Sequence, residues 1–236
     1  MSFRSRAWMA RSPRSRAGML LDTLTAVPVW VASPFMRPWH LRWGATTEEV
    51  ARDMPGDEVV KRAQFNATRA ITIDAPPSAV WPWITQLGYG RGGFYTYDLL
   101  DNAGEPSAES VVEEHQDLKV GDAIPMFHEM NGLAISYDVD SMDAPNSMLW
   151  VHRPHPGEAP DSTWSWRLIK QPGSRTRLVT RMKQEYRWQT PPLAAFNLWL
   201  MEFGDFAMER KMLKGIKRRA EGAASSPRTG VADGGS

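Results

Sequence analysis

The sequence predicts an α+β fold in which an antiparallel sheet grips a long C-terminal helix. Five strand-like runs lie between residues 123 and 188, with short turn signals between them. Before these runs, an apolar strand leads into a proline-started helix between residues 69 and 87. After them, a helix from about Leu193 to Lys217 is apolar nearly all round as far as Met208. Because such a helix has to be buried, the strands must pack against it.

The N-terminal 40 residues form an arm of uncertain role. Residues 1–42 carry seven arginines against one aspartate, and the apolar run 19–36 is broken by Asp22 and two prolines. Arginines before an apolar stretch are typical of a signal peptide or a membrane anchor, although the aspartate and prolines weaken a spanning segment. The alternative is an arm that packs on the domain through its aromatic residues Trp30, Phe35 and Trp39. We expect a cytoplasmic protein, with association with a membrane through residues 19–36 left open.

The domain itself is expected to span residues 41–221. Thr46 and Glu49 have the spacing of a capping box at the start of a short helix near residues 47–53. A turn at residues 54–57 follows, and the first strand is expected over Arg69–Asp74. The helix after it is stopped by Gly88, and the small-residue composition of residues 222–236 predicts a disordered tail.

Turn signals after residue 118 divide the chain into strands joined by hairpin-length loops, which predicts an antiparallel meander. The strands are expected near residues 123–128, 133–140, 147–153, 162–170 and 176–188.

Alternation along these strands predicts which face is internal. One face of the 133–139 run holds Leu133, Ile135, Tyr137 and Val139, and the 164–168 run adds Trp164, Trp166 and Leu168. In the last strand the inward row is expected to run from Leu178 through Thr180, Met182, Gln184 and Tyr186 to Trp188. The opposite row, Arg177, Arg181, Lys183, Glu185 and Arg187, is expected to face solvent, as are the basic residues Arg210 to Arg219 of the last helix.

At this point the residues resemble the START-like helix-grip superfamily, which includes polyketide cyclases and lipid-transfer domains. The resemblance covers residues 40–220 and is most specific to an uncharacterised bacterial branch at Arg42-Trp43-Gly44-Ala45-Thr46, Pro55-Gly56-Asp57, Arg69-Ala70-Ile71-Thr72-Ile73, Ala75-Pro76-Pro77, Val80-Trp81-Pro82-Trp83 and the stretch from Gly88 to Asp98. It implies a curved antiparallel β-sheet wrapped around the C-terminal α-helix, with an internal apolar cavity for a lipid-like or polycyclic ligand. It supplies no catalytic residues, because the superfamily supports several functions on one scaffold.

The glycine-rich loop at residues 88–93 follows a helix, whereas a phosphate-binding glycine loop follows a strand and opens a helix. Dinucleotide binding is therefore rejected. Two alternatives remain, a lid that brings Phe94, Tyr95 and Tyr97 over the cavity mouth, and simple loop packing. Asp98 and Asp101 are expected to cap the junction between this loop and the next helix.

The candidate ligand-binding residues are those predicted to line the cavity, although core packing is an alternative for each ring. They are Trp83, Tyr89, Phe94, Tyr95, Tyr97, Tyr137, Trp150, His152, Trp164, Trp166, Gln184, Tyr186, Phe196, Trp199 and Phe203. The polar ones are the best candidates for orienting a ligand, since a dry core does not tolerate them without partners.

Catalysis has only weak candidates in the sequence, namely His152, Tyr137 and His128. Pro154 separates His152 from His155 and no carboxylate has metal-ligand spacing, so no metal and no cofactor is expected. Residues 43–209 hold 14 basic against 24 acidic side chains, which argues against nucleic-acid binding.

The leading functional hypothesis is therefore a non-catalytic carrier or sensor of a small hydrophobic ligand. The alternative is an enzyme of the cyclase or dehydratase type that acts on a polyketide-like or other hydrophobic substrate in the same cavity. A third reading is a binding module that the N-terminal arm holds at a membrane.

Overall fold

A computed structural model describes residues 15–25, 27–28, 36–127, 135–155, 157–186, 192, 198 and 200–225 of the chain. Its helices are α2 (Arg16–Leu24), α4 (Arg37–His40), α5 (Thr47–Ala51), α6 (Pro77–Thr85), α7 (Asp98–Asp101) and α9 (Phe206–Ser225), with a 3-10 turn at Glu113–His115 and a π-helical segment at Leu200–Asp205. Its strands are β1 (Phe65–Ile73), β2 (Ala123–Pro125), β3 (Ser136–Asp143), β4 (Ser147–His152), β5 (Ser162–Gln171) and β6 (Arg175–Gln184).

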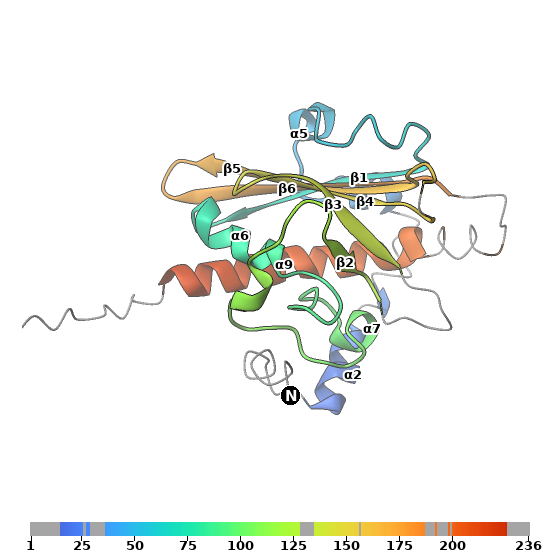
Figure 1. The fold of residues 1–236 in the computed structure, drawn as a ribbon. Coiled ribbons are helices and arrows are strands. Elements are labelled where there is room, and N and C mark those ends of the chain that lie inside the picture. Colours follow the sequence, from blue (N-terminus) through green and yellow to red (C-terminus); the bar gives the residue numbers. More distant parts are fainter. Residues whose placement is uncertain are drawn as a thin grey trace, which may run out of the picture.

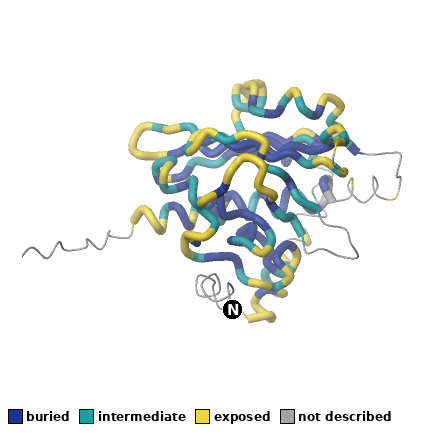
Figure 2. The backbone as a smooth tube through the Cα atoms, viewed as in Figure 1, coloured by how far each residue is buried: buried dark blue, intermediate teal, exposed yellow. Residues whose placement is uncertain are grey.

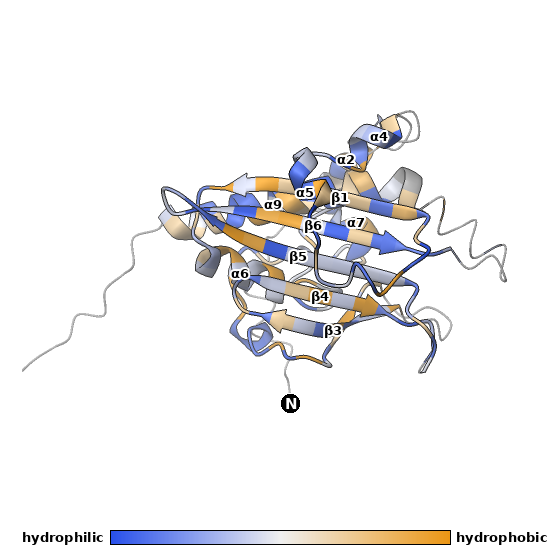
Figure 3. Ribbon diagram, turned by 90° about the horizontal axis from the view of Figure 1, so that it is seen from above, coloured by the Kyte–Doolittle hydropathy of each residue, from blue (hydrophilic) through white to orange (hydrophobic). Residues whose placement is uncertain are grey.

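The six strands form one sheet in the order β1-β6-β5-β4-β3-β2, and every neighbouring pair is antiparallel. The predicted meander is thus confirmed from β2 to β6, and β1 returns to pair with β6 at the edge (Figure 3). β1 begins at Phe65, earlier than predicted, because Asn66 and Thr68 lie on the outer face and the buried Phe65 and Ala67 lie on the inner face, which extends the alternation toward the N-terminus. The predicted helix after β1 is also confirmed, with Pro82 inside α6.

α9 lies along one face of the sheet, so that the layers are the sheet above and the helix below (Figure 1). The core between them draws on both inner faces and on α6. Ile73, Trp150 and Leu178 are fully buried on the sheet side, and Leu213 and Ile216 are fully buried on the helix side. The predicted grip of the last helix is therefore confirmed. α9 runs to Ser225, which is beyond the boundary predicted at residue 221.

The outer face of β1 and β6 is covered by the chain before β1, which corrects the prediction that the charged row of the last strand faces solvent. α5 and the turn after it lie over this face (Figure 1). Arg181 is buried there and forms an ion pair with Asp57, while Arg177 binds Glu49 at 2.7 Å. These side chains are charged because they bind the segment that lies over this face, residues 46–59, which we call the cover. Buried charges need such partners. The predicted capping box of Thr46 and Glu49, which starts α5, is confirmed.

The free edge of β1 is protected by the segment just before the cover. Thr68 N–H donates to Leu41 O at 2.8 Å, and Ala70 N–H donates to Trp43 O at 3.1 Å. Gly44 follows with φ +73°, and a Cβ there would lie 2.1 Å from Ala70 O. Only glycine fits such a close approach in the left-handed region. This pairing leaves the edge with fewer open backbone groups for aggregation.

The last basic stretch also differs from prediction in one place. Arg219 is buried, donates to Ala108 O at 2.8 Å and stacks over the Tyr95 ring at 4.2 Å. The other basic residues of α9 are exposed or half-buried, as predicted.

The N-terminal arm packs on the domain at two described points. Trp39 contacts Phe206 edge to face at 5.2 Å, as the packed-arm alternative expects of that ring, whereas Trp30 and Phe35 lie outside the described residues. α2 lies beside α7 and is fixed by the buried Met19 and an ion pair between Asp22 and Lys211. Within the described chain, the helices are all too short or too polar to cross a bilayer.

Candidate functional site

The inner face of the sheet carries a cluster of three tryptophans on two adjacent strands. Trp164 and Trp166 of β5 are stacked with ring centroids 4.9 Å apart, and Trp150 of β4 meets both edge to face at 5.6 and 5.3 Å. Trp83 of α6 is buried in the same core and meets Tyr95 at 6.1 Å. The predicted rings are therefore brought together, and each one packs against other rings.

These indoles differ in how their N–H groups are satisfied. Trp164 Nε1 donates to Thr180 Oγ1 at 2.8 Å. By contrast, Nε1 of Trp83, Trp150 and Trp166 is buried and meets no acceptor anywhere in the described part of the chain. A buried donor without a partner costs about 1–3 kcal/mol, and native proteins leave few of them. Three such donors facing one core are an arrangement that an oxygen-bearing guest would satisfy.

A second feature of the inner face is a buried ion cluster between β1 and α9. Arg69 is fully buried, and its Nη1 binds both Asp205 and Glu209 while its Nε donates to His40 O at 2.9 Å. Arg69 Nη2 meets no acceptor in the described residues. Asp205 closes the π-helical segment, a distortion that occurs frequently at functional sites.

Burial is the main cause of the pKa shifts at this cluster. Burial raises the pKa of Glu209 to about 7, against the lowering effect of Arg69. Burial, followed by the charge of Arg69, lowers the pKa of His40 to about 4. Thr180 donates to Glu209 and accepts from Trp164, so the carboxyl is linked to the aromatic cluster. Glu209 can therefore hold or release a proton near neutral pH next to these rings.

A third feature is a polar row at the end of the sheet where β3, β4 and β5 meet. His152 Nδ1 lies 2.7 Å from Asp161 Oδ1, and Tyr137 Oη lies 2.6 Å from Ser162 Oγ. Ser162 Oγ also donates to the Lys183 carbonyl, so Tyr137 is the donor in its bond to Ser162. The Tyr137 and His152 rings are 5.7 Å apart, and burial raises the pKa of Tyr137.

This arrangement resembles the orientation of an acid–base histidine by a carboxylate. A bond from Nδ1–H to Asp161 fixes the tautomer and leaves Nε2 as the nitrogen that can exchange a proton. The predicted candidates Tyr137 and His152 are thus neighbours, and Gln184 joins the row on β6 opposite Ser162. Asp161 and Ser162 were missed, because neither residue belongs to a recognisable motif.

The glycine-rich loop is built into the body of the protein. Gly88 and Gly93 form a bridge, and Phe94 and Tyr95 are buried in the main core. Tyr95 Oη donates to Trp83 O at 3.0 Å. Of the two alternatives, the structure thus favours loop packing over a lid for these rings. Tyr97 is correspondingly buried in a separate small cluster with Ala207.

Asp98 and Asp101 lie at α7 and are both buried. Asp98 Oδ1 accepts from Ser107 Oγ at 2.5 Å, and Asp101 Oδ2 accepts from Thr96 Oγ1 at 2.5 Å. They therefore tie α7 to its flanking loops. The predicted capping role is wrong, because both aspartates lie within the helix and its N-cap, Tyr97, makes no side-chain cap bond. Burial raises the pKa of Asp101 to about 7.

We expect Asp101→Asn to stabilise the protein at pH 8 by about 2–4 kcal/mol. The folded carboxyl, with its raised pKa, binds a proton more tightly than the unfolded one. Its contribution is therefore complete below about pH 4 and is lost as the pH rises through 7. The neutral amide has no such loss. Urea unfolding at pH 4.5, 6 and 8 measures the difference, which should shrink toward low pH; a constant difference would contradict the assignment.

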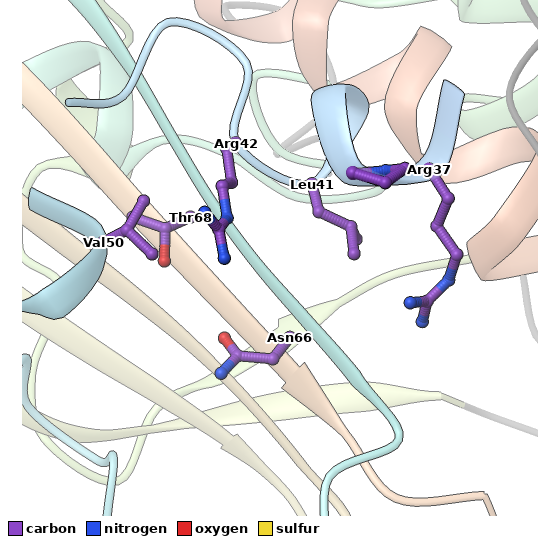
Figure 4. Close-up of a pocket in the computed structure, with 7 residues that line it drawn as sticks. Arg37, Leu41, Arg42, Val50, Asn66 and Thr68 are labelled. Atoms are coloured by element: carbon purple, nitrogen blue, oxygen red, sulfur yellow. The ribbon is translucent and has the colours of Figure 1, made fainter. Parts of the chain in front are cut away.

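A recess of about 390 Å³ opens on the opposite side of the sheet, at the outer face of β1. Its walls include Arg37, Leu41, Arg42, Val50 and Asn66 (Figure 4). It lies between the cover and β1, and not between the sheet and α9. The internal cavity expected from the resemblance stays a prediction.

The remaining predicted site residues lie in different places. Gln184 and Tyr186 are buried, and Tyr89 packs half-buried against the main core. His128, Phe196, Trp199 and the side chain of Phe203 lie outside the described residues.

Arg69, Asp205 and Glu209 were missed by the sequence analysis, although two of them had a signal. Arg69 shares a strand face with Phe65 and Ile73, and Glu209 shares a helix face with Phe206 and Leu213, so both are charges on apolar faces.

The antiparallel sheet laid against one long terminal helix defines a helix-grip protein, the class that the resemblance to the START-like superfamily predicts. No family model and no curated protein matches the chain.

Among solved structures, a hypothetical protein of Helicobacter pylori is 14% identical over 71% of this chain and 95% of its own, with a TM-score of 0.44. A protein of Mycobacterium smegmatis is 15% identical over 73% and 98%, with a TM-score of 0.42. A polyketide-cyclase-like protein of Corynebacterium glutamicum is 14% identical over 72% and 99%, with a TM-score of 0.40. At such scores these likenesses carry nothing about ligand or activity.

Proposed function

We propose that the protein binds a small, mainly apolar ligand that carries an oxygen acceptor, between the inner face of the sheet and α9. The observation that carries the proposal is the set of buried indole N–H groups of Trp83, Trp150 and Trp166, which meet no acceptor among the described residues. The ring faces suit a lipid-like or polycyclic body. The unpaired N–H groups suit a carbonyl, carboxyl or hydroxyl oxygen of that body, because a hydrogen bond to this oxygen removes the free-energy cost of a buried donor without an acceptor.

The first test is native mass spectrometry of the full-length protein, with identification of any small molecule released on mild denaturation. A second test uses two probes with the same ring system, anthrone, which has a carbonyl oxygen, and 9,10-dihydroanthracene, which has none. The wild type should prefer anthrone by about 5–100-fold, the value of one hydrogen bond.

Trp83→Phe, Trp150→Phe and Trp166→Phe each keep an apolar ring and remove one N–H. The variant that lacks the N–H bound to the anthrone oxygen should show a preference of about twofold or less. An unchanged preference in all three variants would contradict the role of these N–H groups. Trp39→Phe is the control, because Trp39 is half-exposed and lies on the N-terminal arm. Absence of any bound apolar molecule, together with no binding of either probe, would refute the proposal.

The alternative is a cyclase or dehydratase-type enzyme, and one observation favours it. His152, oriented by Asp161, lies beside the buried Tyr137, so a base and a phenolic donor face the same region. If the ligand identified above loses water on incubation with the wild type, His152→Gln and Tyr137→Phe should each slow that loss by about 100-fold. An unchanged ligand mass, or full turnover in both variants, would contradict the enzyme hypothesis and favour the carrier hypothesis.

A further inference from the structure

The orientation of α2 is unusual for a helix packed on a soluble body. Its polar side faces inward, where Asp22 binds Lys211 and Thr23 is half-buried. Its outward side carries Leu20, Leu21 and Leu24, which are 54, 67 and 62% exposed. Apart from the buried Met19, the apolar side chains of α2 are thus exposed. The tube of this helix is largely coloured as exposed in Figure 2.

The three leucines and Ala17 recur at the spacing of a single helix face. Ala17 is also exposed, and Val27, two residues past the C-cap Thr25, is 42% exposed. Three leucines exposed together on one helix mark a contact surface, whereas single exposed apolar side chains are common. α2 is also held in place, because Ser15 caps its first turn by accepting from Gly18 N–H at 3.1 Å.

The charge of the sequence before Asp22 indicates what kind of partner the apolar face of α2 binds. Five arginines and no acid precede Asp22 in the sequence, namely Arg4, Arg6, Arg11, Arg14 and Arg16. An apolar helix face that follows an arginine-rich sequence fits a bilayer surface that carries anionic lipids. A second copy of the chain would bring like charges together at the same place. The body between residues 43 and 209 is acidic, so it would be repelled and attraction has to come from this end.

We propose that α2 docks the protein on an anionic lipid bilayer, with Leu20, Leu21 and Leu24 inserted into the interface. α2 has nine residues, so it lies in the interface and does not cross the bilayer. The positive charge of the sequence before Asp22 supplies an attraction to anionic headgroups, and this attraction should fall with salt. This docking is independent of the ligand proposed above.

The test is co-sedimentation of the full-length protein with sucrose-loaded vesicles of phosphatidylcholine alone or with 30 mol% phosphatidylglycerol, about the anionic content of a bacterial-type membrane. The wild type should bind the anionic vesicles at least about tenfold more strongly, and this gain should largely vanish in 0.5 M salt, where the Debye length is about 4 Å. Replacing all three leucines, Leu20→Gln, Leu21→Gln and Leu24→Gln, should reduce binding by roughly 100-fold.

Glutamine adds no charge, so that loss would report insertion and not repulsion. Val120→Gln is the matched control, since Val120 is 60% exposed on a loop away from α2, and it should bind as the wild type does. Circular dichroism and light scattering on the same samples report folding and oligomeric state. The proposal would be overturned if the triple variant bound as strongly as the wild type, or if the wild type showed no preference for anionic vesicles. It would also be overturned if the wild type were a dimer and the triple variant a monomer.

Discussion

Arg69→Met should destabilise the protein by about 3–5 kcal/mol, one of the largest effects expected of any single substitution in the chain. The guanidinium is fully buried and holds both Asp205 and Glu209, so its loss leaves two carboxyls in the core without a cation. Methionine fills a similar volume, which keeps the cavity cost low. Urea unfolding at pH 8 measures the free energy of unfolding.

The same variant should be less destabilised at pH 5 than at pH 8. Burial raises the pKa of Glu209 to about 7 even with Arg69 present, and loss of the guanidinium removes a cause that lowers it. The variant therefore takes up a proton on Glu209 as the pH falls and no longer needs a cation there. Adding Glu209→Gln to Arg69→Met should therefore recover about 1–3 kcal/mol at pH 8. If the double variant is no more stable than Arg69→Met alone, Arg69 does not stabilise the protein by compensating the charge of Glu209.

The fold was largely predictable because its signals are local. The alternation of apolar and polar residues predicted which side chains of β5 and β6 face inward. The turn residues Gly121 and Gly173 lie outside the strands, as predicted. The apolar stripe of the last helix predicted its burial under the sheet. What periodicity could not show is which element covers the other face of the sheet. Segment 41–60 carries a capping box and a turn, but neither shows what the segment packs on, and its contacts with Arg181 join residues far apart in the sequence.

The candidate site was predicted in part. Large rings and inward polar residues on strands are visible in the alternation, so Trp150, Trp164 and Tyr137 could be named in advance. The partners that give them chemical meaning, such as Asp161 for His152, depend on register and loop closure that single-strand patterns do not carry. Arg69 was passed over because an isolated arginine in a strand is ordinarily assigned to the solvent face.

Arg181→Met should cost about 3 kcal/mol and release the cover over β1 and β6. The guanidinium donates to Thr68 Oγ1 at 2.8 Å, to Val50 O at 2.9 Å and to Glu49 O at 3.1 Å, and it forms an ion pair with Asp57. Its removal breaks four contacts at once and leaves polar groups of the cover unmet. Hydrogen exchange should show faster exchange in residues 46–59, with little change in α9.

Arg167→Met is the matched control, because Arg167 reaches the same cover through one exposed bond, from Nη1 to Asp53 O at 3.1 Å. It should cost less than about 1 kcal/mol. Equal losses in the two variants would show that the cover is held by its apolar contacts, such as Met54 against Ala70 and Val179. A larger loss for Arg181 would show that a charged strand face, which alternation assigns to solvent, instead fastens the chain before β1 onto the sheet.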